Sequence, residues 1–452
     1  MLWIIILAGF LLTRLINLNL IPVFADEAIY IRWAQLIGEK AYYFFIPLSD
    51  GKTPLFMWLL APLLKLNFDP LLTGRLLSVF AGLLTLSGAY FLAKKLFSRK
   101  VALIVVILTV FCPFLLFYDR LSLTDSLLTA LIVWSAYLVL APGIKLGLVA
   151  AAALLVKPSA LMYLGLTSLF NLKAWKKLAL AGVIALTIYN LQHFSNMFYM
   201  ISQRGADYLR PPQVENFLNT SRVFFDWSLS YLAWPAIIFF LICLVQSLII
   251  KQKSILILSS LIILPFFALA AVGKIVYPRY LLPMIPFLII ILSWGMANLK
   301  RVTIFLLLAI LLPWLRLDWQ ILTNPAKSAL HQAEKEQYFY SWAAGYGLKE
   351  VAQYLNNLSL NQPVLVATEG SFGTLPDGLK IYFSESKRIE ISGVGFPSTT
   401  ITPGMETALL EGKKVFLLVN FNRYNLSQQN RLSLIAEYPR FGGERLMFYE
   451  IH

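Results

Sequence analysis

The sequence predicts an all-α polytopic membrane protein that carries a small C-terminal α/β domain. Of the 452 residues, 59% are hydrophobic and only 13% are charged, which is far from the composition of a soluble domain. Apolar runs of membrane-spanning length recur up to about residue 317, and a polar, mixed pattern follows. We therefore divide the chain into a membrane domain, residues 1–325, and a second domain, residues 326–452.

The first apolar segment, residues 1–20, is expected to remain as a membrane helix. Val23-Phe24-Ala25 loosely resembles a signal-peptide cleavage site, but no basic residues precede the apolar run and Arg14 interrupts it. Further apolar runs of spanning length cover residues 72–93, 101–118, 123–140, 178–194, 229–250, 254–272, 279–298 and 302–317.

Basic residues between these runs predict the orientation of the chain. They are Lys94, Lys95, Arg99, Lys100, Lys145, Lys173, Lys176, Lys177, Lys251, Lys253, Lys300 and Arg301. If all are cytoplasmic, each group follows an inward crossing, as the positive-inside rule requires. Residues 144–170 have basic residues at both ends, so they are predicted to form two short helices whose outer apex is Lys157-Pro158. The result is about eleven crossings, a cytoplasmic N-terminus and an extracytoplasmic C-terminal domain.

The same topology gathers charged residues on the outer surface. They are Asp26, Glu27, Lys52, Asp119, Arg120, Asp125, Lys157, Arg204, Arg210 and Arg279. Charged side chains at a bilayer are costly, so they indicate a functional site. Two outer loops, 21–71 and 195–228, are too long for simple connections, and 54–66 within the first is expected to be an interfacial or re-entrant helix.

The second domain shows alternating patterns. Residues 342–355 have helical spacing, while residues 363–367, 380–383, 414–419 and 445–451 are typical of short strands. These elements predict a small extracytoplasmic α/β domain.

Several classes of function are excluded. The net charge of +15 does not indicate nucleic acid, because the basic residues lie in short loops between apolar runs. Both cysteines lie inside apolar segments and the three histidines are scattered, which excludes a disulfide framework and a His-rich zinc site. Gly51-Lys52-Thr53 is similar to the end of a P-loop, but Ile46 occupies the position of the first glycine.

Carboxylates and cations at the outer face of a bilayer suit glycosyl transfer from a lipid carrier. A polyprenyl phosphate sugar keeps its tail in the membrane and leaves an anionic phosphate, which needs nearby cations. Lys52, Arg279, Arg204 and Lys157 are the candidate phosphate ligands. The acceptor hydroxyl needs a general base, for which Asp26 is the main candidate. A single displacement of this kind inverts the anomeric configuration.

Three of these residues, Asp26, Lys52 and Arg279, lie in a series of five short segments. The segments are 24–30 (Phe-Ala-Asp-Glu-Ala-Ile-Tyr), 51–55 (Gly-Lys-Thr-Pro-Leu), 75–78 (Arg-Leu-Leu-Ser), 120–128 (Arg-Leu-Ser-Leu-Thr-Asp-Ser-Leu-Leu) and 279–283 (Arg-Tyr-Leu-Leu-Pro). Together they resemble motifs of the GT-C glycosyltransferases, in particular the group of protein O-mannosyltransferases and lipid A aminoarabinose transferases. The resemblance spans the membrane region and implies a GT-C type fold in the cell envelope.

The resemblance also implies roles for single residues. Asp26 would be the catalytic base, with Glu27 beside it as a further catalytic candidate, Lys52 would contact the donor phosphate, and Asp125 would form the second acidic part of the site. Thr53 departs from the family's Lys-Pro-Pro pattern, and the C-terminal domain is not the mannosyltransferases' sugar-binding module. The sugar therefore stays open, as does the acceptor, which is a lipid, a polysaccharide or a protein. No cofactor is required, although a divalent cation could bridge the carboxylates and the phosphate.

Other classes remain as alternatives. A transporter or flippase of lipid-linked sugars also has many helices and charges at its rim, but transporters concentrate ionisable groups at the bilayer midplane and show repeats. A purely structural scaffold leaves the pair Asp26 and Glu27 unexplained. A lipid-linked oligosaccharide polymerase or ligase is the nearest enzymatic rival, and it differs in the acceptor.

Overall fold

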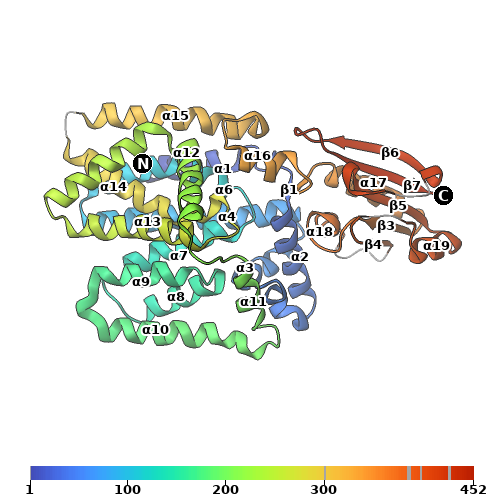
Figure 1. Cartoon of the computed structure of the whole chain (residues 1–452), viewed down its shortest axis with the longest axis horizontal. Coiled ribbons are helices and arrows are strands. Elements are labelled where there is room, and N and C mark those ends of the chain that lie inside the picture. The colour runs from blue at the N-terminus through green and yellow to red at the C-terminus, as the bar shows by residue number, and fades with distance from the viewer. Residues whose placement is uncertain (1, 300–301, 384–387, 398–399, 426–428) are drawn as a thin grey trace. The chain divides into compact units, whose positions relative to one another are not determined.

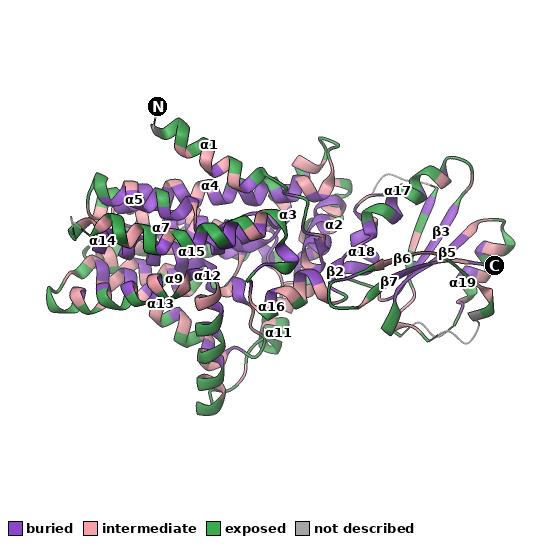
Figure 2. Cartoon of the chain, turned by 90° about the horizontal axis from the view of Figure 1, so that it is seen from above, coloured by how far each residue is buried: buried purple, intermediate pink, exposed green. Residues whose placement is uncertain are grey.

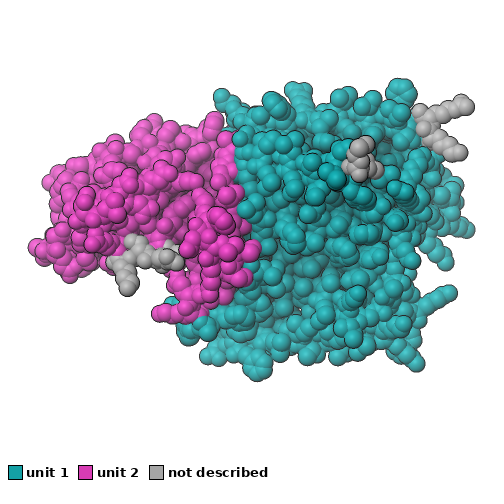
Figure 3. Space-filling view, turned by 180° about the vertical axis from the view of Figure 1, so that it is seen from behind, with its two compact units in different colours: residues 1–18, 41–59, 75–331 teal, residues 19–40, 60–74, 332–452 magenta. Residues whose placement is uncertain are grey.

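The computed structural model describes residues 2–299, 302–383, 388–397, 400–425 and 429–452. The predicted basic pair Lys300-Arg301 lies outside these residues. Two compact units are present (Figure 3): unit 1 comprises Met1–Leu18, Ala41–Leu59 and Arg75–His331, and unit 2 comprises Asn19–Lys40, Leu60–Gly74 and Gln332–His452. This division differs from the predicted one at residue 325, because parts of the first outer loop pack with the C-terminal residues.

Unit 1 is a bundle of helices (Figure 1). The first segment is α1 (Leu2–Leu15), and the later apolar runs are α4 (Pro70–Leu96), α5 (Arg99–Val110), α6 (Pro113–Asp119), α7 (Thr124–Leu138), α10 (Trp175–Asn190), α12 (Val214–Ile249), α13 (Lys253–Val272), α14 (Ile285–Asn298), preceded by the 3-10 helix η4 (Pro278–Met284), and α15 (Thr303–Thr323). Each predicted apolar run thus contains at least one helix. Figure 2 shows exposed residues along α12 and α15, as suits helices that face lipid.

Five described helices are long and apolar enough to cross a membrane, or six if the bent pair α5 and α6 is one span. The chain is therefore a multi-pass membrane protein. Other predicted crossings are shorter: α7 has 15 residues, a length of about 22 Å against a hydrocarbon core of about 30 Å. The count of eleven crossings stays a prediction.

The segment from residue 144 to residue 170 confirms the expected break at its apex. It forms α8 (Ile144–Val156) and α9 (Ala160–Ser168), with Lys157 and Pro158 between them. In the first outer loop the 3-10 helix η1 (Ala41–Asp50) precedes α3 (Leu55–Leu64), which matches the expected short helix. Among the described residues of the second loop, α11 (Met200–Asp207) is the helix that bears Arg204.

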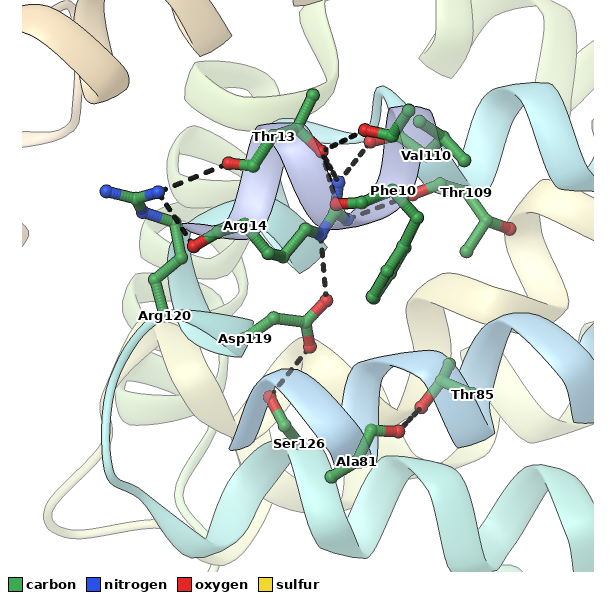
Figure 4. A network of polar contacts seen from close by, with 11 residues as sticks. Phe10, Thr13, Arg14, Ala81, Thr85, Thr109, Val110, Asp119, Arg120 and Ser126 are labelled. Atoms are coloured by element: carbon green, nitrogen blue, oxygen red, sulfur yellow. Dashed lines mark hydrogen bonds and ion pairs between the residues drawn. The ribbon is translucent and has the colours of Figure 1, made fainter. Parts of the chain in front are cut away.

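A buried arginine holds the bend between α5 and α6, which measures 58° (Figure 4). Pro113 has no N–H, so the carbonyl of Thr109 loses its helical partner. Arg14 of α1 replaces it: Nη2 lies 3.2 Å from the Thr109 oxygen, and Nη1 donates to the carbonyl of Val110. A bilayer offers no water to satisfy such groups, so the side chain fixes where the helix breaks.

Arg14 also pairs with a buried carboxylate. Its Nε lies 3.4 Å from Oδ2 of Asp119, and Oδ1 of Asp119 accepts a hydrogen bond of 2.9 Å from the Ser126 hydroxyl. Gly82 makes room for this carboxylate, since a Cβ there would lie 2.5 Å from the Asp119 carboxyl group. The contacts join α1, α4, α6 and α7.

Two further arginines satisfy the carbonyl end of α1. Arg120 donates to the carbonyls of residues 13, 14, 16 and 17, and Arg75 of α4 donates to that of Leu18 at 2.8 Å. The last carbonyls of a helix have no intrahelical partners. Arg75 and Arg120, both part of the resemblance above, therefore stabilise the chain as it leaves the first helix.

Unit 2 contains a five-stranded sheet of order β4-β3-β5-β7-β6. The strands are β3 (Val364–Thr368), β4 (Ile389–Gly393), β5 (Lys414–Asn420), β6 (Leu432–Pro439) and β7 (Arg445–Ile451). β3 is parallel to β4 and to β5, and β7 is antiparallel to β5 and to β6. Alternate residues of β5 face two sides: Leu417 packs with α19 (Pro403–Leu410), and Phe416 contacts Tyr354 of α17 (Leu348–Ser359).

The helix that bears Asp26 belongs to unit 2. Before it, β1 (Val23–Phe24) pairs with β2 (Ala344–Gly345), and α2 (Ala25–Glu39) packs on α18 (Thr374–Lys380). Gln35 of α2 donates a hydrogen bond of 2.7 Å to the carbonyl of Ile381. The predicted strand at 380–383 is wrong, because these residues end α18 and turn under α2.

Breaking the buried ion pair of Arg14 and Asp119 should destabilise the fold. We expect Arg14→Leu to lower the free energy of unfolding by about 3 to 5 kcal/mol, because it leaves Asp119 charged, buried and unpaired. The double variant Arg14→Leu/Asp119→Leu should recover part of this loss. Unfolding in mixed micelles measures the effect, with Arg204→Ala as the control, since the exposed pair of Arg204 and Asp207 contributes less than about 1 kcal/mol. Equal losses for Arg14→Leu and Arg204→Ala would contradict the assignment.

Candidate functional site

One carboxylate and two cations meet within unit 1. Asp125 lies in the first turn of α7, Lys157 follows α8, and Arg279 lies at the start of η4. Lys157 Nζ is 2.6 Å from Asp125 Oδ1, and Arg279 Nε is 4.0 Å from Asp125 Oδ2. The side chains of Asp125 and Arg279 are 4% and 8% exposed and that of Lys157 is 25% exposed. The sequence-predicted residues Asp125, Lys157 and Arg279 thus form one cluster.

Aromatic rings hold the two cations of this cluster. Lys157 Nζ lies 5.1 Å from the ring centre of Tyr280, and the Arg279 guanidinium lies 4.6 Å from that of Tyr277. The negative faces of the rings stabilise the charges without neutralising them. These tyrosines were missed as site residues, although they flank Arg279 in the sequence Tyr-Pro-Arg-Tyr.

The cluster places two cations beside one carboxylate in a largely buried part of the unit. Cations that are already fixed in place can stabilise an anionic ligand. Asp125 accepts a hydrogen bond from Lys157 and forms an ion pair with Arg279, which suits a group that orients them better than a group that removes a proton.

Lys52 and Arg204 lie in adjoining segments of the same unit. Gly51 has a φ of +69°, and a Cβ at this position would lie 2.5 Å from Cβ of Arg204 and 3.1 Å from the carbonyl oxygen of Met200. Lys52 Nζ is 3.2 Å from Oδ2 of Asp50. Arg204 is half exposed and lies 3.8 Å from Asp207. Two predicted phosphate ligands are therefore close in the fold through a glycine contact that the sequence did not indicate.

Asp26 and Glu27 belong to unit 2, whereas the other five predicted site residues belong to unit 1. Asp26 is half-buried in the first turn of α2. Glu27 is fully buried, and its Oε2 accepts a hydrogen bond of 3.0 Å from the backbone N–H of Phe24, the residue before the helix. This contact caps the helix. It gives Glu27 a structural role beside Asp26.

An open groove lies apart from the charged cluster. It has a volume of about 610 Å³ and is lined by residues between Tyr189 and Ser202. No residue of the Asp125 cluster lines it, and we regard the cluster as the better site because its charged contacts are buried. Within the described part of the chain, no group of three or more His, Cys, Asp or Glu side chains is placed to hold a metal ion.

The close approach of Gly51 to α11 predicts an effect on stability. Gly51→Ala should lower the melting temperature by several degrees, because alanine is strained at this φ and its Cβ would overlap Arg204. Gly205→Ala is the matched control: it lies in α11 next to Arg204, and a Cβ there meets nothing within 4 Å. The control should be neutral or slightly stabilising. A Gly51→Ala protein as stable as the control would disprove the contact.

Comparison with known proteins finds structural neighbours and no sequence relatives. No family model and no curated protein matches the chain. The crystal structure of ArnT from Cupriavidus metallidurans bound to undecaprenyl phosphate has a TM-score of 0.59 at 11% identity, over 98% of this chain and 96% of ArnT. The same protein in the apo state gives a TM-score of 0.55.

A second neighbour is the oligosaccharyltransferase of Archaeoglobus fulgidus, in a complex with Zn and sulfate. The TM-score is 0.52 at 12% identity, over 92% of this chain and 67% of that one. Both neighbours are GT-C glycosyltransferases, which confirms the resemblance at the level of structure. The chain therefore has the fold of the GT-C membrane glycosyltransferases.

Proposed function

We propose that the chain is an integral-membrane glycosyltransferase that moves a sugar from a polyprenyl phosphate donor to an acceptor hydroxyl at the extracytoplasmic face. The observation that carries the proposal is the cluster of Asp125, Lys157 and Arg279, which fixes two cations beside one carboxylate inside a membrane-spanning unit. A neighbour of the same fold is bound to undecaprenyl phosphate, which supports a lipid-phosphate ligand.

The donor phosphate binds to the two cations of the cluster. Negative charge grows on the phosphate as the bond to the sugar breaks, and cations already fixed in place stabilise it without reorganising. Lys157 and Arg279 are these cations, and Asp125 keeps both side chains oriented. Lys52 and Arg204 form a second, more exposed pair of cations for the phosphate.

The acceptor hydroxyl is activated by Asp26. Its carboxylate is half-buried in the first turn of α2, and Glu27 fixes the start of that helix through the bond to Phe24. A carboxylate with access to solvent can accept a proton as the hydroxyl attacks the anomeric carbon. The attack displaces the phosphate in one step, so the anomeric configuration inverts.

The extracytoplasmic placement of the site rests on the positive-inside pattern. Lys94 and Lys95 end α4, while Asp125 begins α7 and Lys157 follows α8. Basic connections mark the cytoplasmic ends of helices, so the cluster belongs to the opposite ends. Nucleotide sugars are generally absent from that compartment, which suits a lipid-linked donor.

Turnover by the purified protein tests the proposal. The protein, reconstituted in vesicles, is given a panel of polyprenyl phosphate sugars, and release of polyprenyl phosphate is measured. We expect the Asp26→Asn protein to lose about 100-fold or more in turnover, because its base is removed. Asp207→Asn, an exposed carboxylate on α11, is the control and should turn over normally.

The outcomes separate the proposal from its alternative. Turnover that falls in the Asp26 variant and not in the control supports a transferase. A protein that moves the lipid-linked sugar across the bilayer without releasing polyprenyl phosphate would be a flippase, and turnover indifferent to Asp26 would require another base.

Metal dependence is a separate prediction. We expect EDTA to leave turnover unchanged, because Lys157 and Arg279 already supply the positive charge that a divalent cation would bring. Turnover that stops in EDTA and returns with Mg²⁺ or Mn²⁺ would show instead that a cation bridges the carboxylates and the donor phosphate.

A further inference from the structure

The sheet of unit 2 has an edge with the geometry of a ligand site. The parallel strands β4, β3 and β5 end at the same edge. From β3 the chain passes to β4 on one side, and from β4 it returns across β3 to β5 on the other. Ligands of open α/β sheets bind in the crevice outside the carboxyl ends of the strands at such a reversal. Here the connections change direction between β3 and β5.

At that point a residue that follows β3 is hydrogen-bonded to the last residue of β5. Glu369 follows β3 and is 3% exposed. Its Oε2 accepts from the backbone N–H of Asn420, the last residue of β5, at 2.8 Å, and its Oε1 accepts from the Asn420 side chain at 2.6 Å. The carboxylate is thus fixed by its neighbours, and it in turn anchors a cation.

That cation is Arg423. Its Nη1 lies 3.5 Å from Glu369 Oε1, and its guanidinium lies 4.6 Å from the ring centre of Trp342 and 4.1 Å from that of Phe396. A stacked guanidinium is held without using its N–H donors. In the described part of the chain Arg423 makes no hydrogen bond, and its side chain is 22% exposed. Its free N–H groups match the fork that binds carboxylate or phosphate with two bonds.

Buried polar atoms without hydrogen-bond partners gather at the same edge. Among the described residues they include Oγ1 of Thr368, Oδ1 of Asn420 and Nη1 of Arg440. Arg440 directly follows β6, which runs in the same direction as β5, and its Nε donates to the carbonyl of Ala344 at 2.8 Å. Burial lowers the pKa of Arg440 to about 10, so it remains charged at neutral pH. Nη1 of Arg440 lies 3.8 Å from Oε2 of Glu444 and is therefore ion-paired, so the two oxygen atoms are the groups that point to a bound ligand or water.

Exposed aromatic side chains frame this edge. Each loop that follows a parallel strand carries one: Phe372 after β3, Phe396 after β4 and Phe421 after β5. Trp342 is also exposed and lies against Arg423. Flat apolar rings around a few fixed polar groups are typical of sites for small polar ligands, including sugars.

We propose that this edge binds a saccharide that bears an anionic group, phosphate or carboxylate, with Arg423 as the ligand of the anion. The proposal rests on the proposed function, because it assigns this saccharide as the acceptor. The acceptor is favoured over the donor because α2, which bears Asp26, belongs to the same unit. Trp33 of α2 lies 5.7 Å from the ring of Phe372.

Binding to the full-length protein in lipid nanodiscs tests the inference. Glucose 6-phosphate and glucuronate are the probes, glucose is the neutral comparison, and isothermal titration calorimetry measures the affinity. We expect Arg423→Gln to weaken the two anionic probes at least about tenfold. Arg431→Gln is the matched control: it removes an ion-paired arginine, bonded to Glu406, from the start of β6 at the opposite edge. The control should bind as the wild type does.

Three results would overturn the inference. They are equal affinities for glucose and glucose 6-phosphate, equal effects of the two arginine variants, and inorganic phosphate bound as tightly as glucose 6-phosphate. Arg423→Lys guards against a folding defect, since it keeps the charge and should retain weaker binding. Binding that depends on Arg423 in a protein without transferase turnover would uphold the site and reject the proposed function. Turnover without this binding would uphold the proposed function and reject the site.

Discussion

The membrane unit depends on one physical constraint: each backbone group freed inside a bilayer needs a partner from the protein. Arg14 meets it at the bend before Pro113, and Arg120 and Arg75 meet it where α1 ends. Arg14 also binds Asp119, which receives a bond from Ser126. Ser126 is the neighbour of Asp125, so the network that fixes the helix ends also fixes the start of α7 and the carboxylate of the charged cluster.

Two buried groups of charge differ in what their cations contact. In the Arg14 group one cation contacts a carboxylate and two backbone carbonyls, so it serves the fold. In the Asp125 group two cations from separate elements lie beside one carboxylate and against the rings of Tyr277 and Tyr280. Because this second group fixes two cations in one place, we propose that the donor phosphate binds there.

The sequence predicted what hydropathy and charge determine. The apolar runs became helices, the break at Lys157 was found, and Asp125, Lys157 and Arg279 proved to be close together. Contacts between distant residues were not predictable. In the sequence, Arg14 only interrupts an apolar run. Arg75 and Arg120 belong to segments that resemble family motifs, and the structure shows that both hold backbone carbonyls. Strands β4 and β6 were missed because β4 has one buried residue and β6 has none, so neither shows the apolar pattern of a core strand.

The C-terminal residues pack with the helix that bears Asp26, through β1, β2 and the contact of Gln35 with Ile381. A sequence boundary at residue 325 separates these parts, because the hydrophobic pattern reports membrane burial and not the packing of an outer loop. Asp26, the proposed base, and the proposed acceptor edge are therefore parts of one folded unit, while the cations proposed for the donor belong to the other.

The most direct measurement is the affinity of undecaprenyl phosphate, without sugar, for the reconstituted protein and for its Lys157→Met variant. Binding of the donor phosphate by the Asp125 cluster predicts that affinity falls at least about tenfold in this variant, since a charge-assisted contact is lost. Lys177→Met, an exposed lysine of α10, should bind as the wild type does. Equal affinity in all three proteins would show that the cluster does not bind the donor phosphate.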